Sequence, residues 1–243
     1  QKGDALGCVY SIEGGEQTHY DDIGCPDGTS VIVRDLFFNV PARQKYLKKD
    51  VTEANAIAAT LQKLALSNPG VSIKFIRDNK LEFVTAGDGK LLSCIYTILG
   101  KEFYTNCIPV DYDYNGIKIN GYITKPYSAR ANRSYQIFFV NSRYVKSSTC
   151  LYGLEEAYKG RIMTGKFPGC VLNLTIGSDL VDINSHPAKL EIRFQDEAAV
   201  HDAVYFAAKN ALMLLDEPYE IEFSTRGLAN RRTEEEIFGN VYV

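Results

Sequence analysis

Residues 179–194 read DLVDINSHPAKLEIRF and predict two strands joined by a stiff turn. Apolar residues close the first strand at 181–183. Apolar and charged residues then alternate over 190–194, which is typical of a strand with one buried and one wet face. Between the strands, Pro187 fixes its own φ and biases the residue before it away from the helical region. The turn should therefore be stiff and should present Lys189 at the start of the second strand.

Lys189 allows two interpretations. No acidic residue follows it before Glu191, so its ammonium group can act as a point charge that binds phosphate. It can equally be a solvated lysine beside a turn, which is the usual state of surface lysines. His186 lies in the same turn but has neither metal-ligand spacing nor a nucleophile in sequence reach, so we expect it to order the turn by hydrogen bonding.

The composition is that of an ordinary globular protein. The chain has 243 residues, of which 45% are hydrophobic and 23% are charged, enough for about two domains. No apolar run approaches the roughly 20 residues needed to span a bilayer, and residues 1–4 lack the anatomy of a signal peptide. We expect an intracellular protein, cytoplasmic if bacterial, that is neither secreted nor bound to a membrane. The six cysteines form no C-x-x-C pair, so we expect reduced core thiols and no metal site.

The basic residues are unevenly distributed. The formal net charge is −3, yet residues 114–154 contain no Asp or Glu. This stretch is either a solvated basic edge or a surface that contacts nucleic-acid phosphates without sequence preference and releases them as salt rises. The candidate phosphate contacts are Arg130, Arg133, Arg143 and Lys146.

Residues 1–86 read as a sheet with helices behind it. An unbroken β-branched run at 31–33 suits a strand covered on both faces. Helices are expected from Pro41 and from Asp50, and Asp78-Asn79-Lys80 predicts a hairpin turn. Further strands are expected at 6–12, 18–23, 71–75 and 81–83.

Residues 87–215 read as a second domain, whose boundary with the first is expected at Gly87-Asp88-Gly89. The dipeptide Asn115-Gly116 predicts a tight hairpin. Helices are expected from residues 91, 148 and 196, and further strands at 136–140 and 170–176. Beyond residue 215 the sequence shows no helical or strand periodicity, so residues 216–243 are interpreted as a tail or linker.

Two blocks of this sequence resemble a known family. The block at 179–194 is similar to D-V-N-V-H-P-x-K-x-E-V-R-F, and the block at 28–47 is similar to G-T-x-V-x-V-x-D-L-F-x-N-x-P-A-R-x-K-F-L. Both are signatures of the MutL family of DNA mismatch repair proteins, which belong to the GHKL ATPase group. The chain departs from the family at Ser185, where valine is usual, and at Ser142, where glycine is usual. If position 142 needs a positive φ, serine there costs about 1 kcal/mol.

The resemblance implies roles for particular residues. Lys189 would reach from the second domain into the ATP site of the first and touch the terminal phosphate, as a catalytic and nucleotide-binding residue. Gly28 and Thr29 would lie at the floor of the nucleotide pocket, although the residues themselves fit a plain strand-initiating turn equally well. The basic segment would bind DNA without marked sequence preference.

The resemblance also implies a fold class, which is α+β. Residues 1–86 would be the C-terminal part of a GHKL ATPase α/β sandwich. Residues 87–215 would be a transducer domain with a fold shared by a ribosomal-protein family, in which a mixed sheet has helices on one face and a left-handed crossover.

The chain is expected to be part of a MutL-type DNA mismatch repair ATPase, in which it couples nucleotide state to DNA and partner binding. The family's catalytic glutamate and magnesium-binding asparagine lie upstream of the part matched here, so we expect an internal fragment that is inactive alone. ATP and magnesium would bind the intact protein, with none bound to the fragment. Expected partners are mismatch-containing DNA, a mismatch recognition protein of the MutS family and a second copy of the intact protein. The alternative is a DNA-binding module of no defined sequence preference and without a catalytic role.

Overall fold

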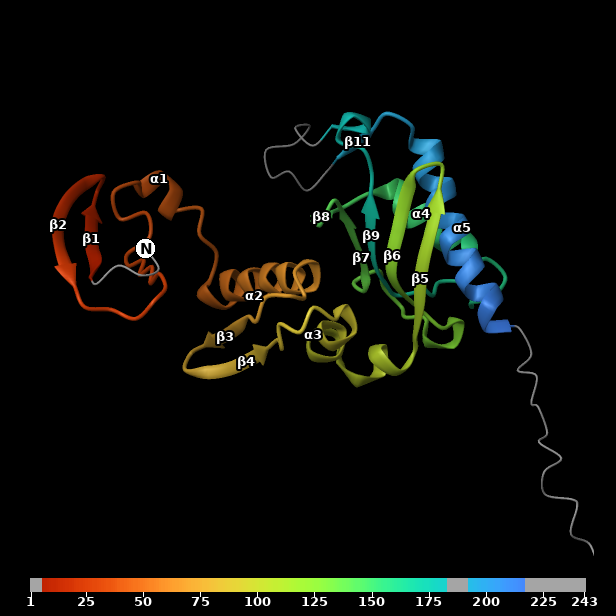
Figure 1. Ribbon diagram of the computed structural model, residues 1–243, viewed down its shortest axis with the longest axis horizontal. Coiled ribbons are helices and arrows are strands. Elements are labelled where there is room, and N and C mark those ends of the chain that lie inside the picture. The colour runs from red at the N-terminus through yellow and green to blue at the C-terminus, as the bar shows by residue number, and fades with distance from the viewer. Residues whose placement is uncertain (1–5, 183–191, 217–243) are drawn as a thin grey trace, which may run out of the picture. The chain divides into compact units, whose positions relative to one another are not determined.

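The computed structural model describes residues 6–182 and 192–216 (Figure 1). Two compact units divide the chain, Gln1–Thr60 and Leu61–Val243. Within the described ranges, no helix is both long and apolar enough to cross a membrane.

The first unit is built on a hairpin. Strands β1 (Gly7–Glu13) and β2 (Glu16–Ile23) pair antiparallel, close to the predicted strands. Helix α1 (Pro41–Gln44) starts at the predicted proline but lasts a single turn. The expected strand at 31–33 is not formed, and its three side chains are 81%, 73% and 70% exposed. No described strand lies beside this run to pair with it, so its β-branched side chains stay in water.

Helix α2 (Asp50–Ser67) begins where the capping residues predict and leads to a second hairpin. Strands β3 (Lys74–Arg77) and β4 (Lys80–Val84) pair antiparallel. Asp78 and Asn79 have φ of 48° and 60°, the left-handed conformation that a two-residue hairpin turn requires. The predicted hairpin is therefore confirmed.

A five-stranded sheet organises the second unit. Its strand order is β5-β6-β9-β7-β8, with β7 and β9 parallel and the other neighbours antiparallel. The predicted mixed sheet is confirmed, whereas the handedness of its crossover stays a prediction. The strands are β5 (Cys107–Tyr114), β6 (Ile117–Thr124), β7 (Gln136–Val140), β8 (Arg143–Val145) and β9 (Cys170–Thr175). The remaining elements are α3 (Leu91–Thr105), α4 (Ser148–Ala157), β10 (Val181–Asp182), β11 (Arg193–Phe194), α5 (Glu197–Asp216) and two short 3₁₀ turns, Pro126–Ser128 and Ser178–Leu180.

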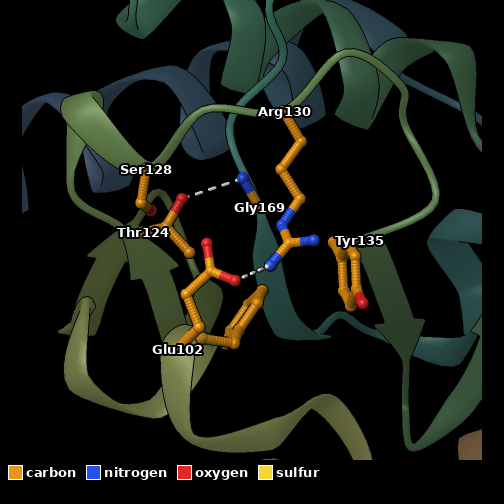
Figure 2. A pocket seen from close by; sticks show the side chains of 7 residues that line it. Glu102, Thr124, Ser128, Arg130, Tyr135 and Gly169 are labelled. Atoms are coloured by element: carbon orange, nitrogen blue, oxygen red, sulfur yellow. Dashed lines mark hydrogen bonds and ion pairs between the residues drawn. The ribbon is translucent and has the colours of Figure 1, made fainter.

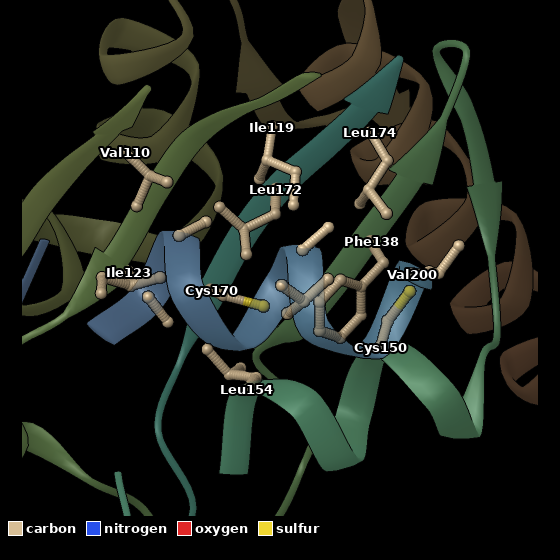
Figure 3. Packing of buried hydrophobic residues seen from close by; sticks show 14 of the residues in the cluster. Val110, Ile119, Ile123, Phe138, Cys150, Leu154, Cys170, Leu172, Leu174 and Val200 are labelled. Atoms are coloured by element: carbon tan, nitrogen blue, oxygen red, sulfur yellow. The ribbon is translucent and has the colours of Figure 1, made fainter. Parts of the chain in front are cut away.

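Helices cover both faces of this sheet, which refines the expectation of helices on one face. Helices α4 and α5 pack against Phe138, Leu172 and Leu174 in the larger core (Figure 3). On the opposite face, α3 and the end of α2 pack against Ile137 and Phe139. All five residues of β7 are buried, so neither face of this strand is exposed to solvent, and helices must pack on both sides.

The turn between β7 and β8 holds a serine in a left-handed conformation. Asn141 and Ser142 have φ of 49° and 65°. The amide side chain of Asn141 exchanges hydrogen bonds with the backbone of Ile176 at 3.0 and 3.1 Å, and Ser142 N donates to Asn173 Oδ1 at 3.0 Å. These contacts to β9 and to the residue directly after it hold the turn in the conformation that the family's usual glycine would adopt without strain.

A second tether joins the basic loop, residues 125–135, to α4. The guanidinium of Arg133 donates to both carboxylate oxygens of Glu155, at 2.6 and 3.0 Å, and lies 4.1 Å from the centre of the Phe167 ring. Gln136 Nε2 donates to the same carboxylate at 3.2 Å. The hydrogen bonds from Arg133 hold the pKa of Glu155 below its ordinary value.

We predict that Ser142→Gly stabilises the protein. Glycine adopts φ of 65° without the Cβ strain of serine, so the free energy of unfolding should rise by about 0.5–1 kcal/mol in denaturant titration. Ser128→Gly is the control, because Ser128 has no positive φ and glycine there should only loosen the unfolded chain. A lower free energy of unfolding for Ser142→Gly would contradict the prediction. It would show that the serine side chain stabilises the fold by more than its backbone strain destabilises it.

We also predict a pH-dependent cost for Arg133→Ala. A carboxyl group with a depressed folded pKa stabilises the fold above its ordinary pKa of about 4.5 and loses that effect as the pH falls through the folded value. The Tm of the variant should therefore lie below that of the parent at pH 7, and the gap should close below about pH 4. Arg133→Lys keeps the positive charge but not the two parallel donors, so its Tm at pH 7 should lie between those of the parent and of Arg133→Ala. A gap that does not change with pH would contradict this assignment.

Candidate functional site

The loop that carries Lys189 has a described base. Residues 183–191, with His186 and Lys189, lie outside the described residues. On either side, β10 and β11 pair antiparallel with Val181 opposite Phe194, which confirms the two predicted strands where they are described. Both side chains are buried in the larger core, each 7% exposed. Both ends of the loop are therefore anchored to the sheet and α5.

Gly28 and Thr29 lie in an irregular, exposed segment of the first unit. Gly28 has a φ of 141°, a conformation in which a side chain would be strained. The strand that such a turn would start, at 31–33, is not formed, so that interpretation is not confirmed, and a place for Gly28 and Thr29 at a pocket floor stays a prediction.

Arg130 is held inside the second unit by three contacts. Its Nη2 donates to Glu102 Oε2 at 2.9 Å, and its guanidinium lies 4.4 Å from the centre of the Tyr135 ring. Its backbone exchanges hydrogen bonds of 2.7 and 2.8 Å with Phe167. Figure 2 shows Arg130 above Glu102 and beside Tyr135, at the edge of a cavity that also includes Thr124. The cavity has a volume of about 10 Å³, room for one water molecule and not for a ligand.

Arg143 and Lys146 differ from Arg130 and Arg133. Both are exposed, one within β8 and one directly after it. Neither pairs with a carboxylate among residues 6–182 and 192–216. Their charges are therefore open to an anion from solution.

A third cation lies beside the same strand. Lys63 of α2 places its Nζ 4.1 Å from the centre of the Tyr144 ring, a cation–π geometry, and burial lowers the pKa of Lys63. No sequence pattern indicated this contact, because the two residues lie in distant elements. The same holds for Glu102 and Glu155, the acids that bind the two arginines of the basic loop.

Metal-ligating side chains do not cluster among the described residues, and four of the six cysteines are buried or half-buried. In the part of the chain that the structure describes, no group of three His, Cys, Asp or Glu side chains could hold a metal ion. Burial raises the pKa values of Cys107 and Cys150 to about 12, so both thiols stay protonated at neutral pH. Cys94, Cys107, Cys150 and Cys170 are buried or half-buried, as predicted, whereas the prediction is wrong for Cys8 and Cys25, which are exposed in the first unit.

Comparison with known proteins agrees with this architecture. Residues 95–213 match the model of a family described as "DNA mismatch repair protein, C-terminal domain". The MutL protein of Symbiobacterium thermophilum is 44% identical over 200 residues, which are 82% of this chain and 32% of that protein. The chain therefore spans about a third of that relative's length.

Two solved structures share the fold. The N-terminal domain of a DNA repair protein has a TM-score of 0.74 and 24% identity, with 90% of this chain and 72% of that chain covered. The ATPase domain of Aquifex aeolicus MutL, complexed with ADP, has a TM-score of 0.58 and 23% identity, with 72% of this chain and 63% of that chain covered. Identity to the curated relative over most of the chain, the matched family and the shared fold lead to one conclusion. The chain belongs to the MutL family of DNA mismatch repair proteins.

Proposed function

We propose that this chain is part of a MutL-type mismatch repair ATPase and that Lys189 supplies positive charge to the terminal phosphate of bound ATP. The observation that carries the proposal is the anchored base of the Lys189 loop, where Val181 and Phe194 are paired and buried. A loop with both ends fixed in a core can hold one charge near a set position, which charge stabilisation during phosphoryl transfer requires.

The first unit supports an incomplete nucleotide domain. The side chains at 31–33, together with Leu36 and Phe38, are at least half exposed, an unusual state for a cluster of large apolar residues. A strand of this composition is ordinarily buried within a sheet. In the proposal, residues 1–86 complete an ATPase domain with other parts of the protein, and residues 87–215 form the transducer domain.

The nucleotide itself is proposed from the family. The Aquifex aeolicus MutL ATPase domain was solved with ADP, and Gly28 and Thr29 are the candidates in this chain for the pocket floor. Magnesium is expected in the intact protein, and the proposal assigns none of its ligands to the described residues. The contribution proposed for this chain is therefore electrostatic: Lys189 neutralises phosphate charge, and the activation of water belongs to other residues.

We predict that Lys189→Ala lowers ATP turnover of the intact protein roughly 10²-fold, the usual effect of losing one preorganised group at developing charge. Nucleotide binding, measured by fluorescence of an ATP analogue, should weaken much less, since other groups hold the base and sugar. Lys80→Ala, at the exposed β3–β4 hairpin, is the matched control. Unchanged turnover in Lys189→Ala would remove this residue from the mechanism.

DNA binding is a second proposed function, supported by Arg143 and Lys146, which pair with no carboxylate among the described residues. In this proposal the two residues contact phosphates without sequence preference. Arg130 and Arg133 contribute less, since Glu102 and Glu155 already balance their charges. In this proposal, the intact protein would bind DNA, a MutS-type mismatch recognition protein and a second copy of itself during mismatch repair.

The expected effect of Arg143→Ala with Lys146→Ala is weaker binding to duplex DNA in fluorescence anisotropy. The slope of log affinity against log salt should shrink by about 0.9 for each phosphate that the variant no longer neutralises. Arg130→Ala should change that slope less, and Lys80→Ala should leave it unaltered. Equal slopes for the double variant and the parent would rule out both residues as phosphate ligands.

A further inference from the structure

A groove that none of the functions above uses lies at the end of α4. It is formed by the last turns of α4 and by residues 159–167, which lead towards β9, and has a volume of about 610 Å³. We call it the α4 groove. A hollow of this size accommodates several side chains of a peptide.

Apolar side chains are unusually available in the α4 groove. Met163 is 79% exposed and Tyr152 is 64% exposed, and both line it together with Ile162 and Phe167. Both residues suit contact with a bound apolar side chain. The flexible side chain of methionine adapts to the shape of its partner, and the rigid ring of tyrosine offers a large contact area.

The charges that face the groove do not cancel. Glu155 is occupied by Arg133, and Glu156 Oε2 lies 3.1 Å from His201 Nε2. Lys159 and Lys166 also line the groove, and neither pairs with an acid within residues 6–182 or 192–216. A neutral histidine does not cancel the charge of Glu156, so the groove presents an apolar surface with two unpaired lysines and one carboxylate, an excess of one positive charge.

The groove is held in place by backbone contacts. Phe167 and Arg130 exchange two backbone hydrogen bonds, and Lys166 N donates to Met163 O at 3.1 Å. Gly160 and Gly165 both have φ of 78°, which fixes the two bends of the loop. A preformed groove binds a peptide at a lower entropy cost than a loop that must first become ordered.

We propose that the α4 groove receives residues Glu234–Phe238 of this same chain. This segment reads EEEIF, so three carboxylates precede two large apolar residues. The carboxylates complement Lys159 and Lys166, and the apolar pair complements the surface around Met163.

The chain is long enough for this contact. The contact of 3.1 Å between Glu156 Oε2 and His201 Nε2 shows that the end of α4 lies beside α5. From His201 the helix continues for about 22 Å to its end at Asp216. The stretch from there to Glu234 can span up to about 60 Å when extended. A tethered segment also has an effective concentration of order millimolar, which favours it over a free peptide of the same sequence.

The two methionines of the chain allow a direct test. Met163 lines the groove and Met213 lies on α5, so a full chain labelled with ¹³C at the methionine methyl groups gives one reporter and one internal reference in NMR spectra. Three variants are compared with the parent: Ile237→Ser with Phe238→Ser, Glu234→Lys with Glu235→Lys and Glu236→Lys, and Lys159→Glu with Lys166→Glu. Lys118→Glu, an exposed residue of β6, is the charge control.

The expected result is a shift of the Met163 methyl signal in each of the three variants, with the Met213 signal and the Tm unchanged. Combining the two charge reversals should restore the parent signal, and dilution should leave it unaltered. Identical Met163 signals in the parent and the two tail variants would overturn the proposal, because the groove would then be empty or reserved for another protein. A tail effect that disappears on dilution would also overturn it, by assigning the occupant to a second copy.

Discussion

The second unit depends on the burial of β7 from both sides. Ile137 and Phe139 belong to one core, and Phe138 and Val140 belong to the other. Each fully buried large side chain contributes about 1.5–3 kcal/mol relative to exposure. A slip of one residue would exchange the two sets between the cores, so the register against β9 is strongly specified. Both helical covers are therefore needed to keep one strand in place.

This core also fixes the segments proposed to act on phosphate. Strand β9 leads through a short 3₁₀ turn into β10, and β11 leads into α5. Val181, Phe194 and Val200 belong to the same core cluster as the sheet and α4. The base of the Lys189 loop is thus a continuation of the most buried part of the unit.

Local signals predicted the turns well, because a turn is determined by the few residues within it. Asn115-Gly116 and Asp78-Asn79 adopt the positive φ values that their types favour. The second cover of the sheet was missed, although five consecutive non-alternating residues of β7 indicated it. The acid partners of Arg130 and Arg133 could not be predicted, since Glu102 and Glu155 lie 28 and 22 residues away and meet them only in the fold. The nucleotide role proposed for Lys189 rests on family resemblance, because a lysine beside a turn has no local sequence pattern that indicates function.

The distribution of paired acids decides which positive charges remain available. In the sequence, residues 114–154 form one basic stretch without an acid. In the fold, the carboxylates of α3 and α4 bind the two arginines of the basic loop and leave Arg143 and Lys146 unpaired within the described ranges. An ion pair at a half-exposed position fixes geometry more than it adds stability. The same two acids therefore fix the loop and reduce the number of basic side chains in this stretch that stay unpaired within the described ranges, so a count of lysines and arginines along the chain overstates the positive charge available to an anion.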